Sequence, residues 1–118
     1  MKLRRLLWMA ALPLLLTLLL GATGCARKNL TTPGLYKTYC ARCHGGRGQG
    51  VARGLKLYPH LDFRASPLVR RGDRAAVREQ IAEGDGPMPG FKRRLTAQEI
   101  DRLVDFTFQL SRTPGKEN

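Results

Sequence analysis

Five consecutive residues hold most of the reactive side chains in this chain of 118 residues. The segment CARCH, from Cys40 to His44, contains two of the three cysteines and one of the two histidines. Thiols at positions i and i+3 lie on one face of a helical turn, so both can reach the same ligand or partner. The spacing therefore points to a shared use of Cys40 and Cys43.

Three kinds of chemistry use such a pair. A redox disulfide is possible in an oxidising compartment, but it usually opens a helix in a strand–helix–strand setting, and no such pattern is visible here. A zinc site needs further ligands at metal spacing, whereas His60 is the only other histidine. Covalent attachment of haem uses the whole Cys-x-x-Cys-His unit, with both sulfurs on the haem and His44 on the iron. We favour this third interpretation, so the expected cofactor is one covalently attached haem c with its iron.

A haem held in this way has a second axial position, and Met88 is the candidate for it. It is the only methionine beyond the N-terminal apolar segment and stands in GDGPMPGF. A lone methionine is more often a core residue, but core methionines usually lie on the apolar face of a helix. Pro87 and Pro89 each fix φ and stiffen this segment, which suits a thioether held at a fixed distance from iron.

These residues give the sequence its resemblance to the class I c-type cytochromes, which carry one haem with His/Met ligation. The resemblance covers about residues 33–110. Cys40, Cys43 and His44 match the attachment motif of that family, and Met88, followed by proline, matches its distal ligand.

The resemblance also implies roles for residues outside the two motifs. It implies that the carbonyl of Pro59, in YPHL, orients the ring of His44 through the imidazole N–H. It further implies contact between Tyr36 on the first helix and Phe106 on the last. Thr32 departs from the pattern, because many members have glycine where the two terminal helices cross.

The segments around the motifs are predicted to be helical. LTAQEIDRLVDFTFQL begins with Thr96 and has Glu99 three residues later, a capping box followed by an amphipathic stripe. Asp73 is expected to cap a second helix that ends at Gly84. A short helix is expected over residues 33–43, and no stretch alternates convincingly as a strand. The predicted fold is all-α, with three to five short helices wrapped around the haem as in cytochrome c.

The first 25 residues are of a different kind. Cations at the start, an apolar run at residues 6–20 and small residues after it form the pattern of an export signal. The sequence ATGC resembles the lipobox of bacterial lipoproteins, although Ala22 stands where that family usually has leucine. Cys25 is also the cysteine left over once Cys40 and Cys43 are used together. We therefore expect lipidation at Cys25, with an uncleaved membrane anchor as the alternative.

The predicted organisation is an export signal at residues 1–24, a tether at 25–33, a haem domain at 34–112 and a flexible tail at 113–118. With His44 and Met88 both on iron, no position is open for a substrate, so we expect no catalytic residue and a single-electron carrier. The alternative is a haem-binding subunit of a larger dehydrogenase, oxidase or peroxidase-type enzyme. A peroxidase needs a residue poised over an open iron position, and His60, beside Pro59, is poorly placed for that role.

The charge of the chain indicates the kind of partner. The formal net charge is +12, and cations gather in two groups. These groups are Arg70, Arg71, Arg74 and Arg78, and then Lys92, Arg93 and Arg94 after the Met88 segment. Cations near a haem edge would steer a redox protein that carries an acidic docking patch. We expect no nucleic-acid partner, because the export signal places the domain in the periplasm or on the outer face of the cytoplasmic membrane.

Overall fold

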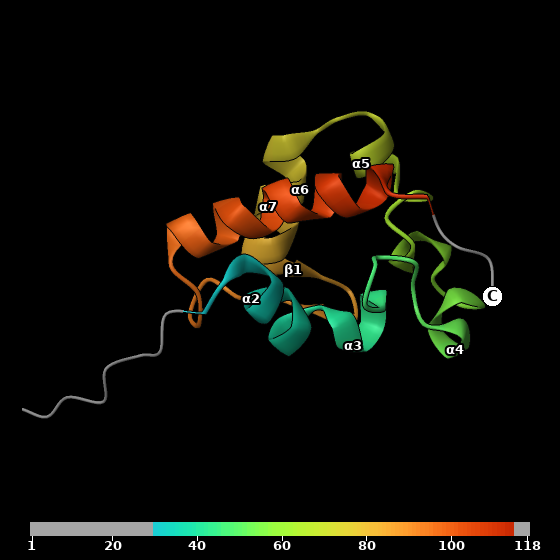
Figure 1. Ribbon diagram of the computed structural model, residues 1–118, viewed down its shortest axis with the longest axis horizontal. Coiled ribbons are helices and arrows are strands. Elements are labelled where there is room, and N and C mark those ends of the chain that lie inside the picture. The colour runs from blue at the N-terminus through green and yellow to red at the C-terminus, as the bar shows by residue number, and fades with distance from the viewer. Residues whose placement is uncertain (1–29, 115–118) are drawn as a thin grey trace, which may run out of the picture.

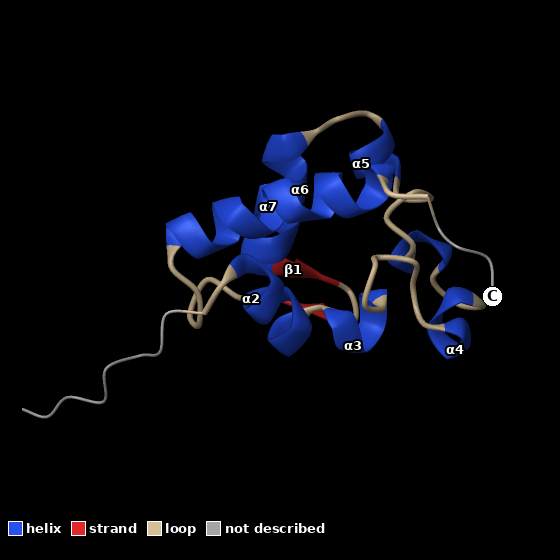
Figure 2. Ribbon diagram, in the orientation of Figure 1, coloured by secondary structure: helices blue, strands red, loops and turns tan. Residues whose placement is uncertain are grey.

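The computed structural model describes residues 30–114, and these residues are mostly helical (Figures 1 and 2). Within this range the six α-helices are α2 (Thr32–Tyr39), α3 (Ala41–His44), α4 (Ala52–Leu55), α5 (Pro67–Arg70), α6 (Arg74–Glu83) and α7 (Ala97–Arg112). A 3₁₀ turn, η1 (Pro59–Leu61), and a hairpin of β1 (Gly84–Asp85) and β2 (Met88–Pro89) complete the elements. The predicted helical class is confirmed, and three of the six helices are single turns of four residues.

The two longest helices begin where their capping residues predict. The Thr96 hydroxyl accepts a hydrogen bond from the Glu99 amide at 3.2 Å, and the Glu99 carboxylate accepts one from the Thr96 amide at 2.8 Å. These two bonds form the predicted capping box of α7. The Asp73 carboxylate accepts from the Ala76 amide at 3.0 Å and caps α6, as expected. Both caps satisfy amide groups that have no partner within the helix.

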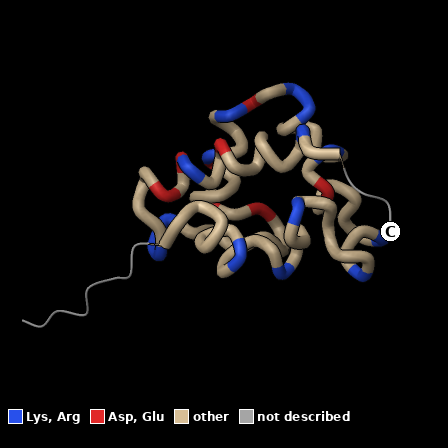
Figure 3. The backbone as a smooth tube through the Cα atoms, viewed as in Figure 1, with Lys and Arg blue, Asp and Glu red and all other residues tan. Residues whose placement is uncertain are grey.

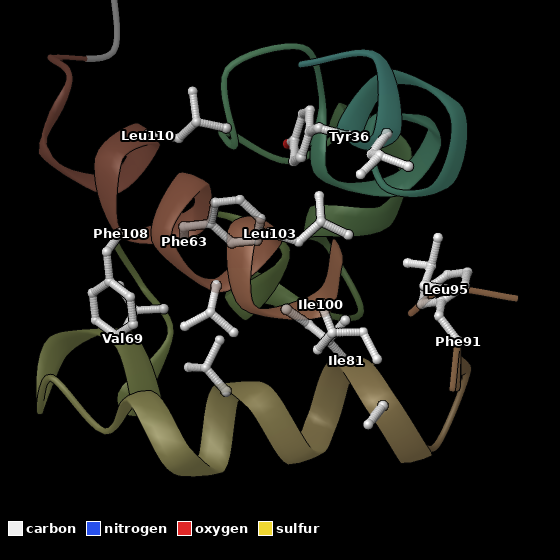
Figure 4. Close-up of a cluster of buried hydrophobic side chains, with 14 residues drawn as sticks. Tyr36, Phe63, Val69, Ile81, Phe91, Leu95, Ile100, Leu103, Phe108 and Leu110 are labelled. Carbon is white, nitrogen blue, oxygen red and sulfur yellow. The ribbon is translucent and has the colours of Figure 1, made fainter. Parts of the chain in front are cut away.

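The long helix α7 is the centre of the packing. It crosses α2 on one side and lies against α6 on another, and its apolar stripe joins both to one buried cluster (Figures 1 and 4). The rings of Tyr36 on α2 and Phe106 on α7 meet edge to face with centroids 5.3 Å apart. The predicted contact between the first and last helices is therefore confirmed. The residues that α7 buries are Glu99, Ile100, Leu103, Val104, Thr107, Phe108 and Leu110.

A short hairpin, which was not predicted from the sequence, follows α6. Asp85 pairs with Met88 in antiparallel register, and the chain then returns along the end of α6. The Phe91 amide donates to the Ile81 carbonyl at 3.0 Å, and the Lys92 amide donates to the Ala82 carbonyl at 3.1 Å. These bonds use carbonyls in the last turn of α6, which lack helical partners, and they fix Met88 close to that helix.

Several predictions concern residues that the structure does not describe. The export signal at 1–24, Cys25, the tether up to residue 29 and the tail from residue 115 lie outside the described residues. Within residues 30–114, α2 begins at Thr32, two residues before the predicted start of the haem domain. Over the same range, no helix has both the length and the apolar character needed to cross a membrane.

Candidate functional site

The two cysteines, His44 and Met88, the predicted haem-binding residues, line one cavity. Its volume is about 920 Å³, close to the upper end of the range typical of ligand pockets, about 300–1,000 Å³. Cys40, Cys43 and His44 reach it from the junction of α2 and α3, and Met88 reaches it from the hairpin. Much of the remaining wall is apolar and includes Val51, Leu61, Leu68, Val69 and Ile81.

Cys40 does not have the properties of an activated redox thiol. Cys40, at the C-cap of α2, is half-buried, while Cys43 in α3 is exposed, and no disulfide joins the two. Burial, and secondarily the nearby Cys43, raises the pKa of Cys40 to about 11. Reactive Cys-x-x-Cys motifs instead lower the pKa of one thiol. In the described part of the chain, no cluster of three or more Cys, His, Asp or Glu residues could hold a metal ion, so the zinc interpretation gains no support.

One hydrogen bond fixes the tautomer of His44. Its Nδ1 lies 2.9 Å from the Leu61 carbonyl oxygen. A carbonyl only accepts, so Nδ1 carries the proton and Nε2 keeps the lone pair that a metal ion needs. Burial lowers the pKa of His44, which also favours the neutral imidazole. The ring is therefore prepared as a ligand through Nε2.

The structure corrects the predicted partner of His44. The resemblance assigned this role to the carbonyl of Pro59, but the carbonyl of Leu61 occupies it. Pro59 is the first residue of η1, and its carbonyl accepts from the Asp62 amide at 3.2 Å along the 3₁₀ turn. Leu61 is the last residue of η1, so its carbonyl is available to the imidazole. Pro59 instead contributes the start of the turn that presents Leu61.

Phe63, which the sequence analysis missed, packs against His44. The two ring centroids lie 4.6 Å apart at an interplanar angle of 32°. The Phe63 amide donates to the Gly48 carbonyl at 2.9 Å, so the aromatic ring lies directly over the glycine-rich loop. Gly48 has φ +70°, and a Cβ at this position would overlap the Phe63 ring. Two signals in the sequence could have identified this contact. Phe63 stands two positions after the turn η1, and Gly48 lies in the loop that faces it.

Met88 and His60 lie in different surroundings. Met88 is half-buried in β2, with exposed prolines on either side, and its side chain lines the same cavity as His44. His60 is exposed in η1, beside the residue whose carbonyl binds His44, and its ring meets Tyr58 edge to face at 6.1 Å. An imidazole, a thioether and two thiols around one apolar cavity form a donor set that fits a covalently attached iron porphyrin.

Comparison with known proteins agrees with this donor set. Residues 30–106 match the family described as "Cytochrome C oxidase, cbb3-type, subunit III". Cytochrome c6 from Aphanizomenon flos-aquae is 31% identical over 75 residues, which cover 64% of this chain and 82% of that protein. Cytochrome c6 from Microcystis aeruginosa is also 31% identical, over 74 residues that cover 61% of this chain and 84% of that protein.

The contact between Gly48 and Phe63 generates a stability prediction. Gly48→Ala is expected to lower the free energy of unfolding for two reasons. The left-handed backbone conformation costs an alanine about 1–2 kcal/mol, and overpacking against the Phe63 ring costs about 1–3 kcal/mol more, because that ring is held between His44 and the core. Gly72→Ala is the matched control, since Gly72 has φ +71° and nothing within 4 Å of an added Cβ. Denaturant unfolding of both variants measures the difference, and equal costs would contradict the proposed ring contact.

Proposed function

The chain belongs to the c-type cytochromes, in the family described as cytochrome c oxidase, cbb3-type, subunit III, and we propose that it carries single electrons with His44 and Met88 as axial ligands. Its cofactor is haem c, attached covalently and containing iron. The observation that carries the proposal is the single cavity lined by Cys40, Cys43, His44 and Met88. In this proposal the two cysteines form the thioether bonds to the haem.

The proposed ligand set favours a carrier over an enzyme. The haem supplies reversible one-electron chemistry at iron, and Met/His ligation raises its reduction potential relative to bis-His ligation. The chain holds His44 in the tautomer that leaves Nε2 for the metal and encloses the site in apolar side chains. With both axial positions taken by side chains, the protein offers no open position for a substrate, so no residue is assigned a catalytic role.

A second candidate function is supported by the family description, which names an oxidase subunit. The same site would then pass electrons within a larger oxidase instead of between separate proteins. A peroxidase-type function has less support, because it would require Met88 to leave the iron. His60, exposed on η1 beside the His44 partner carbonyl, is also poorly placed to act on the opposite face.

The distal ligand can be tested by spectroscopy. Met88→Ala is expected to abolish the near-infrared band of the sulfur–iron bond in the ferric protein and to lower the reduction potential, because a thioether favours ferrous iron. His60→Ala is the control and should leave both the band and the potential unchanged. A wild type without the band, together with a spectrum that changes in His60→Ala, would show that His60 is the ligand instead.

The proposed docking surface lies at the rim of the cavity. Arg42 on α3 and Arg53 on α4 line the cavity, are exposed and make no ion pair within residues 30–114. Lys56 follows α4 and is likewise exposed and without an ion pair in that range. Figure 3 shows Lys and Arg along the edge formed by α3 and α4. We infer that an acidic redox protein docks here, and nucleic acid is not an expected partner.

Three of the seven cations singled out in the sequence form ion pairs between elements of the structure. The guanidinium groups of Arg74 and Arg78 on α6 pair with Asp105 and Asp101 on α7. Lys92 pairs with Glu83 at 2.5 Å. These ion pairs join elements of the fold, so the proposed docking surface depends on Arg42, Arg53 and Lys56 instead.

Salt-dependent kinetics test this surface. Arg53→Glu is expected to slow the oxidation of the reduced protein by hexacyanoferrate(III) several-fold at low salt, because the anion is steered by local positive charge. Arg70→Glu changes the net charge equally, but Arg70 is exposed on α5 and is not among the residues that line the cavity. Stopped-flow rates at several ionic strengths give the comparison, and equal slowing in both variants would mean that only net charge matters.

We also propose that the protein is exported and held at a membrane, in the periplasm or on the outer face of the cytoplasmic membrane, by a lipid on Cys25 or by an uncleaved signal. The export-like residues 1–24 and the leftover Cys25 motivate this proposal, and both lie outside the described residues. At about 3.5 Å per extended residue, the segment from Cys25 to Thr32 spans at most ~25 Å. The haem domain would therefore remain close to the bilayer and to integral membrane partners.

Cell fractionation separates the two anchors. Cys25→Ser is expected to release the haem protein into the soluble fraction, because the acceptor of the lipid is lost. The mass of the wild-type mature N-terminus should correspond to a lipidated Cys25. Retention of the variant at full length in the membrane, with residues 6–20 still present, would contradict lipidation and identify an uncleaved transmembrane anchor.

A further inference from the structure

The Leu61 carbonyl belongs to a segment that is fastened to the fold on its C-terminal side. Asp62 forms an isolated antiparallel bridge with Gln49, and the next residue, Phe63, donates its amide to the Gly48 carbonyl. Both contacts join the segment to the glycine-rich loop that follows the CARCH motif. These two contacts set the distance between the segment that contains Leu61 and the loop next to His44. The position of Leu61 along the loop depends in addition on the contacts of Asp62 and Arg64.

Arg64 supplies that second attachment. Its amide donates to the Asp62 carboxylate at 2.9 Å, and its guanidinium Nε lies 3.1 Å from the same oxygen, Oδ1. Another guanidinium nitrogen donates to the carbonyls of Leu110 at 3.4 Å and Thr113 at 3.3 Å. The two side chains are about a quarter exposed, 27% for Arg64 and 29% for Asp62, so water screens this pair less than a fully exposed one.

The carbonyls that Arg64 reaches are those at the end of α7. The last carbonyls of a helix carry the negative end of its dipole, which a guanidinium complements, and that of Leu110 also accepts from the Thr113 amide at 3.1 Å. Leu110 belongs to the buried cluster that also contains Phe63 (Figure 4). Arg64 therefore joins the segment after Leu61 to the C-terminal end of α7, 46 residues away in the sequence.

We propose that Arg64 is a positioning residue for the iron ligand: by holding Asp62 against the end of α7, it fixes the Leu61 carbonyl and the strength of its hydrogen bond from His44 Nδ1. This proposal rests on the proposed role of His44 as a ligand. A hydrogen bond from the non-ligating nitrogen makes the imidazole a stronger donor, which stabilises ferric over ferrous iron. A variant in which the Leu61 carbonyl is held less firmly should have a weaker hydrogen bond from His44 Nδ1 and therefore a higher reduction potential.

Arginine is suited to this role for a geometric reason. Its planar fork presents several donors at once, so one side chain can bind a carboxylate and two carbonyls together. Lysine carries the same charge on a single nitrogen and cannot span the same acceptors. Arg64→Lys thus removes the attachment while the charge near the iron stays the same, which separates positioning from a change in local electrostatics.

The test uses the haem-loaded protein and a matched control. Arg64→Lys is compared with Arg78→Lys, because Arg78 also joins another element to α7, through Asp101 at 2.6 Å. Two properties are measured: the solvent exchange rate of the His44 Nδ1 proton by NMR, and the reduction potential. We expect Arg64→Lys to exchange this proton at least several-fold faster and to raise the potential, while Arg78→Lys changes neither.

A second variant keeps the proposal testable if Arg64→Lys does not fold. Asp62→Asn keeps the Arg64 contacts with α7 but weakens the pair between the two side chains, so proton exchange should lie between wild type and Arg64→Lys. Unchanged exchange and potential in Arg64→Lys, or equal changes in Arg78→Lys, would overturn the positioning role while leaving the ligand assignment intact. If wild type shows no iron-shifted His44 Nδ1 proton, the assignment of His44 as ligand fails, and the proposal fails with it.

Discussion

The hydrogen bond from His44 Nδ1 to the Leu61 carbonyl is the interaction on which the rest of the site depends. It places the proton on Nδ1 and leaves Nε2 as the only nitrogen available to a metal ion. Without it, the ring could rotate or change tautomer, and neither nitrogen would be fixed as the one available to a metal ion. The 3₁₀ turn at Pro59–Leu61 and the packing of Phe63 on the imidazole ring serve to hold this one contact in place.

The arrangement of the helices explains how so small a domain keeps a cavity of about 920 Å³. Packing of α2 and α6 against α7 forms the protein's own core, and the hairpin after α6 carries Met88 to the cavity. Leu57 and Tyr58, the exposed large apolar residues of the described chain, also line the cavity, where a bound haem would cover them. Small domains bury limited apolar surface, so a covalently attached cofactor adds to the core as well as to the function.

Some cations of the domain form ion pairs within the fold, and others remain exposed where a partner protein could meet them. From the sequence alone, Arg74, Arg78 and Lys92 are expected to belong to a basic surface. In the structure they form ion pairs, two between α6 and α7 and one between Lys92 and Glu83. Exposed ion pairs of this kind contribute at most about 1 kcal/mol each, so their main consequence is to neutralise the charge of these three cations. The cations at the rim of the cavity remain without acidic partners within residues 30–114, and a charged partner would meet them there.

Features that depend on neighbouring residues could be predicted from the sequence. The spacing in CARCH, the prolines around Met88 and the caps at Asp73 and Thr96 each act within a few positions, so they indicated the cofactor, a candidate ligand and two helix starts. Two contacts became known from the fold alone: Leu61 and not Pro59 binds His44, and Arg64 reaches the end of α7. The direction of a carbonyl and the partner of a guanidinium depend on how distant segments cross, and residues 46 positions apart carry no local signal of their contact.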